Sequence, residues 1–238
     1  LNGNIVLILS DHFSEELYYS FLGNNKLGQT LKQIFAFPIA GSTNEPNIKL
    51  VPEASLYGID LGKIILEIDL DNYDYIFDLK EHSVFEGSKY GTKRKSANRF
   101  HRNYPECSAE IMDLKSDSIK QRILDLSEKW IESKSSNDYG VNLNKEFKAL
   151  NRFLDAEFEH AFCVGISVDE KLIAYEIFTL GNNGYSISHF SKIDSNYSGV
   201  YEYLVNQSAI ILLERGIRFL NAEEDMGLPA LRYSKNSY

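Results

Sequence analysis

The pattern of apolar and polar residues is clearest in the second half of the chain. Apolar residues recur three to four positions apart over 118–133 and 145–158, which predicts two amphipathic helices. Residues 161–168 and 171–180 are apolar-rich runs joined by an Asp-Glu turn, which is typical of a β-hairpin. The other predicted elements of this half are strands at 109–114, 185–193 and 217–220 and a helix at 200–215.

The first half has a weaker pattern. Ser14 is a suitable N-cap and Gly23 a suitable stop for a helix at 14–22. Pro38 favours an edge position for a strand at 33–40. Strands are also expected at 5–10 and at 64–70, where apolar and acidic residues alternate, and residues 41–46 are expected to form a loop.

The order of elements in the second half is helix, helix, three meandering strands, loop, helix and strand. Helices and strands that follow one another in this way are typical of an α+β protein, whereas a repeated βαβ winding would alternate them. We therefore expect an α+β fold with mixed, mostly antiparallel sheets flanked by helices.

Composition excludes several classes of protein. Hydrophobic residues at 43% and charged residues at 25% describe a chain that folds around a core, and a net charge of -9 argues against wrapping nucleic acid over a whole face. Cys107 and Cys163 are far apart and form no CxxC pair, so neither a disulfide framework nor a metal site is expected. No apolar run is long enough for an integral membrane segment, and reduced thiols fit a cytoplasmic location.

Residues 87–104 form a basic segment without a single acid. Local excess of positive charge in an acidic chain indicates an anionic partner, and a solvated linker face is the alternative. Lys95 and Arg99 would share one face if the segment is helical. Its cations are Lys89, Lys93, Arg94, Lys95, Arg99 and Arg102.

A second cluster of charge closes the chain. Glu223, Glu224 and Asp225 follow the predicted strand 217–220, and three adjacent acids repel one another, which can raise the pKa of one carboxyl into the range of a general base. The alternative is a solvated acidic turn. Arg232 and Lys235 could pair with these acids or hold a phosphate or carboxylate.

The loop 194–199 precedes the predicted helix 200–215. Its Ser195, Ser198 and Gly199 could offer backbone amides to a phosphate or an oxyanion, because the first amides of a helix lack partners. Tyr201, in the first turn, could protonate a leaving group, although a packing role is common for such a tyrosine. His189, alone on a strand, is more typical of a structural residue than of a base.

The second half resembles the GNAT acyltransferase fold in its order of elements. Four features, in their order and spacing, are similar to the family described as the phosphatidylglycerol lysyltransferase C-terminal domain, from about Phe35 onward. They are 73–79 (YDYIFDL), 87–100 (GSKYGTKRKSANRF), Trp130 and 221–235 (NAEEDMGLPALRYSK). The resemblance implies two tandem GNAT-like lobes, at 1–104 and 105–238. It also implies transfer of an aminoacyl group from a charged tRNA to a lipid head group.

These observations give a hypothesis of acyl or aminoacyl transfer from aminoacyl-tRNA or acyl-CoA to an amine or hydroxyl such as a lipid head group. Expected partners are an anionic small molecule or the tRNA acceptor end, with peripheral contact to lipid head groups. A non-catalytic ligand-sensing module is the alternative, and donor, acceptor and oligomeric state stay open. The expected catalytic residues are Glu224, Asp225 and Tyr201, and the expected substrate-binding residues are Lys93, Arg94, Arg99, Glu223, His189, Arg232 and Lys235. The expected donor loop is Ser195, Ser198 and Gly199, and no metal is expected.

Overall fold

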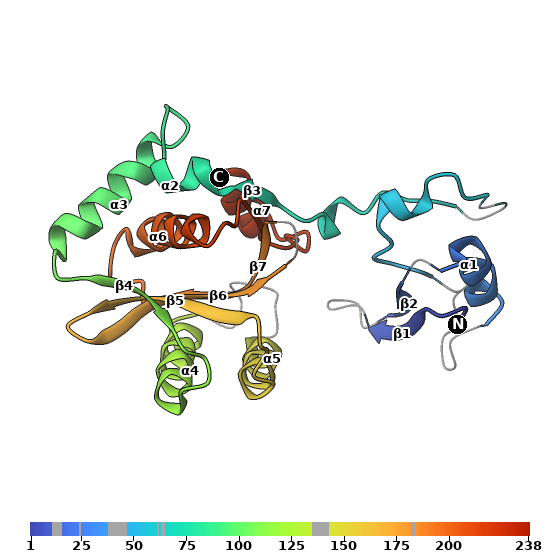
Figure 1. The fold of residues 1–238 in the computed structure, drawn as a ribbon, viewed down its shortest axis with the longest axis horizontal. Coiled ribbons are helices and arrows are strands. Elements are labelled where there is room, and N and C mark those ends of the chain that lie inside the picture. Colours follow the sequence, from blue (N-terminus) through green and yellow to red (C-terminus); the bar gives the residue numbers. More distant parts are fainter. Residues whose placement is uncertain are drawn as a thin grey trace. The chain divides into compact units, whose positions relative to one another are not determined.

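The computed structural model describes residues 1–10, 16–23, 25–37, 47–60, 62, 65–134, 143–181 and 184–238. The chain divides into an N-terminal unit, Leu1–Asp69, and a C-terminal unit, Leu70–Tyr238 (Figure 1). Among the described residues no helix has both the length and the apolar character needed to cross a membrane.

The N-terminal unit is built on an antiparallel hairpin and one helix. β1 (Ile5–Ser10) pairs with β2 (Leu17–Leu22), and α1 (Leu27–Phe35) packs on them through a small core. The core residues are Tyr19, Phe21, Leu27, Leu31 and Ile34.

Three predictions in this region are wrong. The helix predicted at 14–22 is the strand β2 where it is described, because Tyr19 and Phe21 alternate into the core. The strand predicted at 33–40 begins as the end of α1, whose apolar residues recur at helical spacing. The segment predicted as a strand at 64–70 is not a strand over its described residues. The loop predicted at 41–46 lies outside the described residues.

The C-terminal unit contains a six-stranded sheet in the order β3-β8-β7-β6-β5-β4. Its neighbouring strands are antiparallel except β7 and β8, which are parallel. The bounds are β3 Ile76–Asp78, β4 Ser108–Met112, β5 Ala161–Val168, β6 Lys171–Leu180, β7 Tyr185–Ile193 and β8 Phe219–Asn221.

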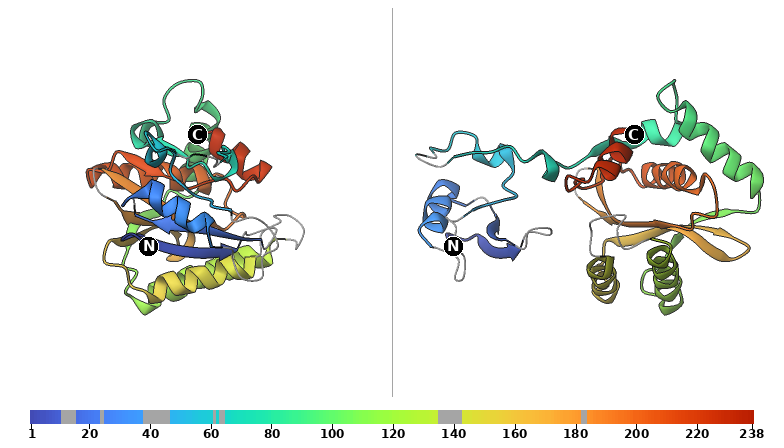
Figure 2. Two further views of the ribbon diagram at one scale, coloured as in Figure 1. Left: turned by 90° about the vertical axis from the view of Figure 1, so that its right-hand side faces the viewer. Right: turned by 180° about the vertical axis from the view of Figure 1, so that it is seen from behind.

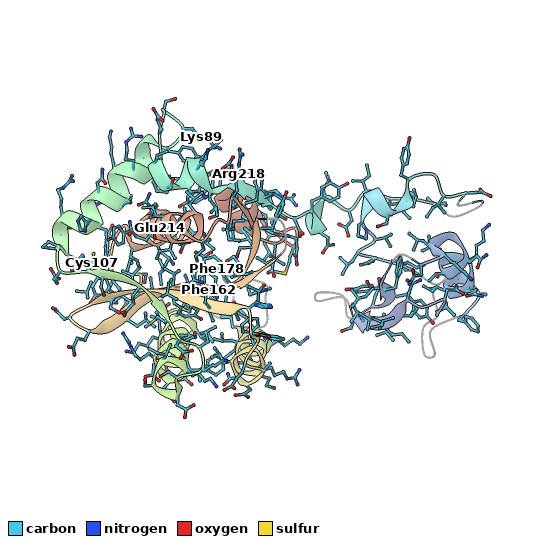
Figure 3. All side chains as sticks on the ribbon, viewed as in Figure 1. Lys89, Cys107, Phe162, Phe178, Glu214 and Arg218 are labelled. Carbon is cyan, nitrogen blue, oxygen red and sulfur yellow. The ribbon has the colours of Figure 1, made fainter. Side chains whose placement is uncertain are left out.

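Helices cover both faces of this sheet (Figures 1 and 2). α4 and α5 lie on one face, and α6 lies on the other together with α2 and α3. One hydrophobic cluster lies between the sheet and α6, and another lies between the sheet and the helices α4 and α5. In the cluster on the α6 side, the rings of Phe162 and Phe178, labelled in Figure 3, stack with centroids 5.4 Å apart. The bounds are α2 Leu79–Val84, α3 Gly91–Asn103, α4 Asp117–Glu132, α5 Leu143–Asp155, α6 Val200–Glu214 and α7 Pro229–Asn236.

The helices α3 and α6 approach closely at Gly199. This residue caps α6 with a φ of 90°, a backbone conformation that residues other than glycine rarely adopt. A Cβ atom built there would lie 2.5 Å from the carbonyl oxygen of Ser96 in α3. Only a residue without a side chain therefore allows this contact.

The predicted α+β class, with a mixed and mostly antiparallel sheet flanked by helices, is confirmed. The hairpin β5–β6 has the predicted bounds, and its turn residues Asp169 and Glu170 both have positive φ, as a tight hairpin turn requires. The boundary between the units falls at 69/70, and β3 and α3 belong to the second unit, where β3 pairs with β8 and α3 packs on α6. The predicted bounds 1–104 and 105–238 are bounds of GNAT-like lobes, which this division does not test. That the chain holds two GNAT-like lobes stays a prediction.

Candidate active site

The ladder between the parallel strands β7 and β8 is short. It runs over three residue pairs and ends at Ile187–Asn221. Beyond that point the chain after β8 follows Tyr75 instead, since the Ala222 amide donates to the Tyr75 carbonyl at 2.9 Å and the Tyr75 amide donates to the Glu223 carbonyl at 3.1 Å. The edge of β7 beyond Ile187 therefore has no described strand partner on its β8 side.

A β-bulge follows immediately in β7. Ile177 of β6 pairs with Phe190 and Phe178 pairs with Ser188, so His189 is the extra residue. A bulge redirects the side chain that it carries, and it is common beside active sites. The sequence prediction treated His189 as a minor candidate, but the fold places it where the strands β7 and β8 separate.

His189 lies between a carboxylate and a hydroxyl. Its Nδ1 is 3.1 Å from Oε1 of Glu223, and its Nε2 is 2.8 Å from Oγ1 of Thr179. The Phe153 ring of α5 packs beside the imidazole with centroids 5.3 Å apart. The His189 side chain is 23% exposed and that of Glu223 is 42% exposed, so solvent reaches the pair.

Asp225 has a different environment. Its buried carboxylate accepts hydrogen bonds from Arg232 (Nε, 2.7 Å, and a terminal nitrogen, 2.7 Å), from the Tyr75 hydroxyl (2.6 Å) and from the Gly227 amide (2.8 Å). The hydrogen bonds from Arg232 hold the pKa of Asp225 well below its usual range, and Asp225 in turn raises the pKa of Tyr75. Asp71 binds the same guanidinium at 2.6 Å. A carboxylate held ionised in this way is a weak base and a strong anchor.

The remaining acids and cations of the closing motif fix the same loop. The Lys235 ammonium donates to the carbonyl oxygens of Ala222, Glu223 and Glu224, and burial lowers the pKa of Lys235. The half-buried Glu224 carboxylate makes no hydrogen bond or ion pair within the described part of the chain. Arg232 and Lys235 thus bind the protein itself, and Glu224 is left available.

Glu176 on β6 was not predicted as a site residue. It is 8% exposed and accepts a hydrogen bond at 2.6 Å from the Ser188 hydroxyl, which lies beside His189 in the bulge. Burial raises the pKa of Glu176 to about 7. The sequence signal was a lone acid inside the apolar run 171–180.

The basic segment forms α3, and its cations have separate partners. Lys93 donates to the Ser237 hydroxyl at 2.8 Å and lies 3.6 Å from the centroid of the Tyr238 ring. Arg94 donates to the carbonyl of Phe85. Arg99 donates to Ser198 of the predicted donor loop at 3.0 Å.

The predicted site residues thus fall into distinct groups. Arg99 lies against the donor loop, where Gly199 caps α6, and no contact among the described residues joins Arg99 to Asp225. Tyr201 packs edge-on against Tyr238 with centroids 6.0 Å apart, and burial raises the pKa of its phenol. The Ser195 side chain makes no hydrogen bond to the other predicted residues over the described chain.

Potential metal ligands and surface hollows are two further features of the described residues. Within the described ranges no group of three or more His, Cys, Asp and Glu side chains is placed to hold a metal ion. An open hollow of about 680 Å³ lies in the N-terminal unit, and its lining contains none of the predicted site residues.

Several solved structures are similar to this chain. A conserved protein of unknown function from Bacteroides thetaiotaomicron has 23% sequence identity and a TM-score of 0.79, with 100% of this chain and 79% of that chain covered. The two therefore share a fold. The structure of L-PGS from Bacillus licheniformis has 15% identity and a TM-score of 0.47, with 64% of this chain and 46% of that chain covered.

The sequence itself identifies the family. No protein with a curated description matches it. The family model described as "Phosphatidylglycerol lysyltransferase, C-terminal" matches residues 49–238, which is well over half of the chain. The protein therefore belongs to this family.

Proposed function

We propose that this protein transfers an aminoacyl or acyl group from an activated ester or thioester to an amine or hydroxyl, with His189 and Glu223 handling the proton. The family supports an acyl- or aminoacyl-transferase-like role. The observation that carries the proposal is the His189–Glu223 pair at the bulge where β7 and β8 separate. The donor and acceptor classes are inferred from the cations of α3 and from the family.

The chemistry requires a base, an orienting group and donors for the developing oxyanion. Glu223 orients the imidazole through Nδ1 and stabilises its protonated form, which leaves Nε2 to take a proton. The edge of β7 beyond Ile187 lacks a strand partner on the β8 side, so backbone amides there can serve the oxyanion. Glu224 is available to bind the ammonium group of an aminoacyl donor.

The exposed cations of α3 favour a donor that carries phosphates. Lys95, Arg99 and Arg102 are exposed, and Arg99 contacts Ser198 just before the N-terminus of α6. A charged tRNA supplies many phosphates, whereas an acyl-CoA supplies few. We therefore propose aminoacyl-tRNA as the donor and the head group of a phospholipid as the acceptor class.

The test is a transfer assay with two donors, a mixed pool of radiolabelled aminoacyl-tRNA and acetyl-CoA, and with phosphatidylglycerol vesicles or free amines as acceptors. His189→Ala and Glu223→Gln should lower the rate roughly 100-fold or more, as expected when a general base is lost. His160→Ala, whose side chain is exposed elsewhere, is the matched control and should keep the rate.

Salt dependence separates the donors. If tRNA phosphates bind α3, affinity should fall steeply with salt, by roughly 0.7–0.9 log units per log unit of salt for each phosphate contact. Arg99→Ala should reduce that slope by about 1. Full activity of folded His189→Ala protein would refute the assigned base, and ligand binding without any transfer would favour the sensing alternative.

A further inference from the structure

Thr179 completes a line of three side chains that is not explained by packing alone. It lies on β6, half-buried, with Oγ1 2.8 Å from Nε2 of His189. On the other side of the imidazole, Nδ1 lies 3.1 Å from the Glu223 carboxylate. A hydroxyl, an imidazole and a carboxylate in this order form the arrangement by which enzymes activate a hydroxyl nucleophile.

The direction of the hydrogen bonds follows from the chemistry of the end groups. An ionised Glu223 only accepts, so Nδ1 of His189 carries the hydrogen that faces it. In the neutral imidazole Nε2 then has a free lone pair, and the Thr179 hydroxyl donates to it. The hydroxyl is therefore poised to lose its proton to His189.

The bulge produces this alignment. Thr179 pairs with Ile187 across the two strands, and His189 is the inserted residue that turns back toward Thr179. The neighbouring hydroxyls have other acceptors, since Ser186 donates to the Thr179 carbonyl at 2.9 Å and Ser188 donates to Glu176. Among the described hydroxyls of β6 and β7, that of Thr179 is the one bonded to an imidazole.

We propose that Thr179 is a catalytic nucleophile that carries the acyl group between donor and acceptor, a step that rests on the proposed acyl transfer. Oγ1 attacks the carbonyl carbon of the donor ester while its proton moves to Nε2 of His189. The donor's C–O bond breaks, and the leaving alkoxide takes that proton. The acyl group is then held as an ester on Thr179.

The second half restores the enzyme. The acceptor amine or hydroxyl attacks the acyl-threonine ester, His189 takes its proton, and that proton returns to Oγ1 of Thr179 as the ester bond breaks. No oxidant, reductant or further reactant is needed. The mechanism is double displacement, and it predicts that donor alone acylates the protein.

The experiment uses the full chain with p-nitrophenyl acetate as an uncharged probe of the first half-reaction. Acid-quenched protein is analysed by intact mass and peptide mapping. The wild type should carry one acetyl group on Thr179, with a burst of p-nitrophenol. Thr179→Val, which keeps the shape and removes the hydroxyl, should lose the burst and the adduct, and Thr179→Ser should retain both. Thermal melts should show all variants folded.

The outcomes separate this inference from the proposed function. Absence of a Thr179 adduct on the wild type, or a Thr179→Val variant that transfers from aminoacyl-tRNA or acetyl-CoA at the wild-type rate, would overturn the nucleophile and leave the proposed transfer intact. A Thr179 adduct without transfer from either donor would support the nucleophile and count against the proposed function. A loss of roughly 1,000-fold in transfer by Thr179→Val would support both.

Discussion

Asp225 and Glu176 are both buried carboxyl groups of the C-terminal unit, and their surroundings shift their pKa values in opposite directions. Asp225 meets a guanidinium, a phenol and a backbone amide, and its pKa is held low chiefly by Arg232. Glu176 accepts a hydrogen bond from the Ser188 hydroxyl and pairs with no cation of the described residues, and burial raises its pKa to about 7. The comparison shows that the partner of a buried acid, rather than its burial, decides whether it is ionised.

The two acids therefore have different uses. Asp225 stays ionised and ties α7 to the loop after β8 and to Tyr75, which fixes the backbone that carries Glu223. Glu176 holds the bulge from the opposite face of the sheet through Ser188, next to His189. In the proposed mechanism both residues position the base His189.

The largest expected effect follows from removing the anchor. Asp225→Ala leaves Arg232 and Tyr75 without their shared acceptor, and we expect a loss of roughly 2–3 kcal/mol in the free energy of unfolding. Fluorescence of Trp130, the single tryptophan, reports urea unfolding of the C-terminal unit. A change below about 0.5 kcal/mol would contradict the role of Asp225 as an anchor.

Glu176 should produce a pH dependence of opposite sign. Its pKa is about 7 in the folded protein against an ordinary 4.5, so the folded state keeps this proton longer than the unfolded state does. The contribution of Glu176 to the free energy of unfolding is therefore fully present below pH 4.5. It falls by roughly 1–3 kcal/mol as the pH rises to 7. Glu176→Gln should flatten this fall in Trp130 unfolding curves recorded across that range. An unchanged pH profile would count against the raised pKa.

The loss of stability at low pH tests the same comparison from the side of Asp225. Asp225 contributes stability above its ordinary pKa of 3.8, and that contribution is lost as pH falls further, because its folded pKa is depressed. Asp225→Asn should remove this acid-side loss and leave the fall between pH 4.5 and 7 in place. If Asp225→Asn changed both the loss of stability at low pH and the fall between pH 4.5 and 7, the titrations of the two carboxyls would be coupled.

A smaller effect is expected at Ser188. The hydrogen bond from this hydroxyl lowers the pKa of folded Glu176, so Ser188→Ala should extend the pH-dependent fall in stability to higher pH. The hydrogen bond itself contributes about 1 kcal/mol when Glu176 is ionised. Unfolding at pH 6 and at pH 8 measures this difference, which should be larger at pH 8.

The smallest effect on stability is expected at Glu223. Its side chain is 42% exposed and forms one pair with His189, so Glu223→Gln should change the free energy of unfolding by less than about 0.5 kcal/mol. The same variant should lose transfer activity. A large destabilisation would place Glu223 among the anchors with Asp225.

The elements of the C-terminal sheet could be predicted because local pattern and tertiary environment agree there. β5 and β6 match their predicted bounds, and their apolar runs are buried against helices on both faces. The same reasoning failed for the N-terminal unit. The segment 17–22 was assigned by a cap and a stop signal, but the alternation of Tyr19 and Phe21 into the core decided its structure.

The site could be predicted only in part. Sequence proximity singled out Glu223, Glu224 and Asp225 together, but it could not tell the anchored acid from the exposed one, because Tyr75 lies 150 residues away along the chain. Thr179, the proposed nucleophile, and Glu176 were not predicted because they lie within an apolar strand, and only the register at the bulge brings them beside His189 and Ser188.

The glycine that caps α6 sets a limit on how the basic helix can be engineered. Since the Ser96 carbonyl occupies the place of a side chain at Gly199, α3 cannot slide along α6 without first separating from it. Lys95 and Arg99 are therefore carried by a helix whose position against α6 is fixed at this contact. A different helix in the place of α3 could approach α6 this closely only while position 199 remains glycine.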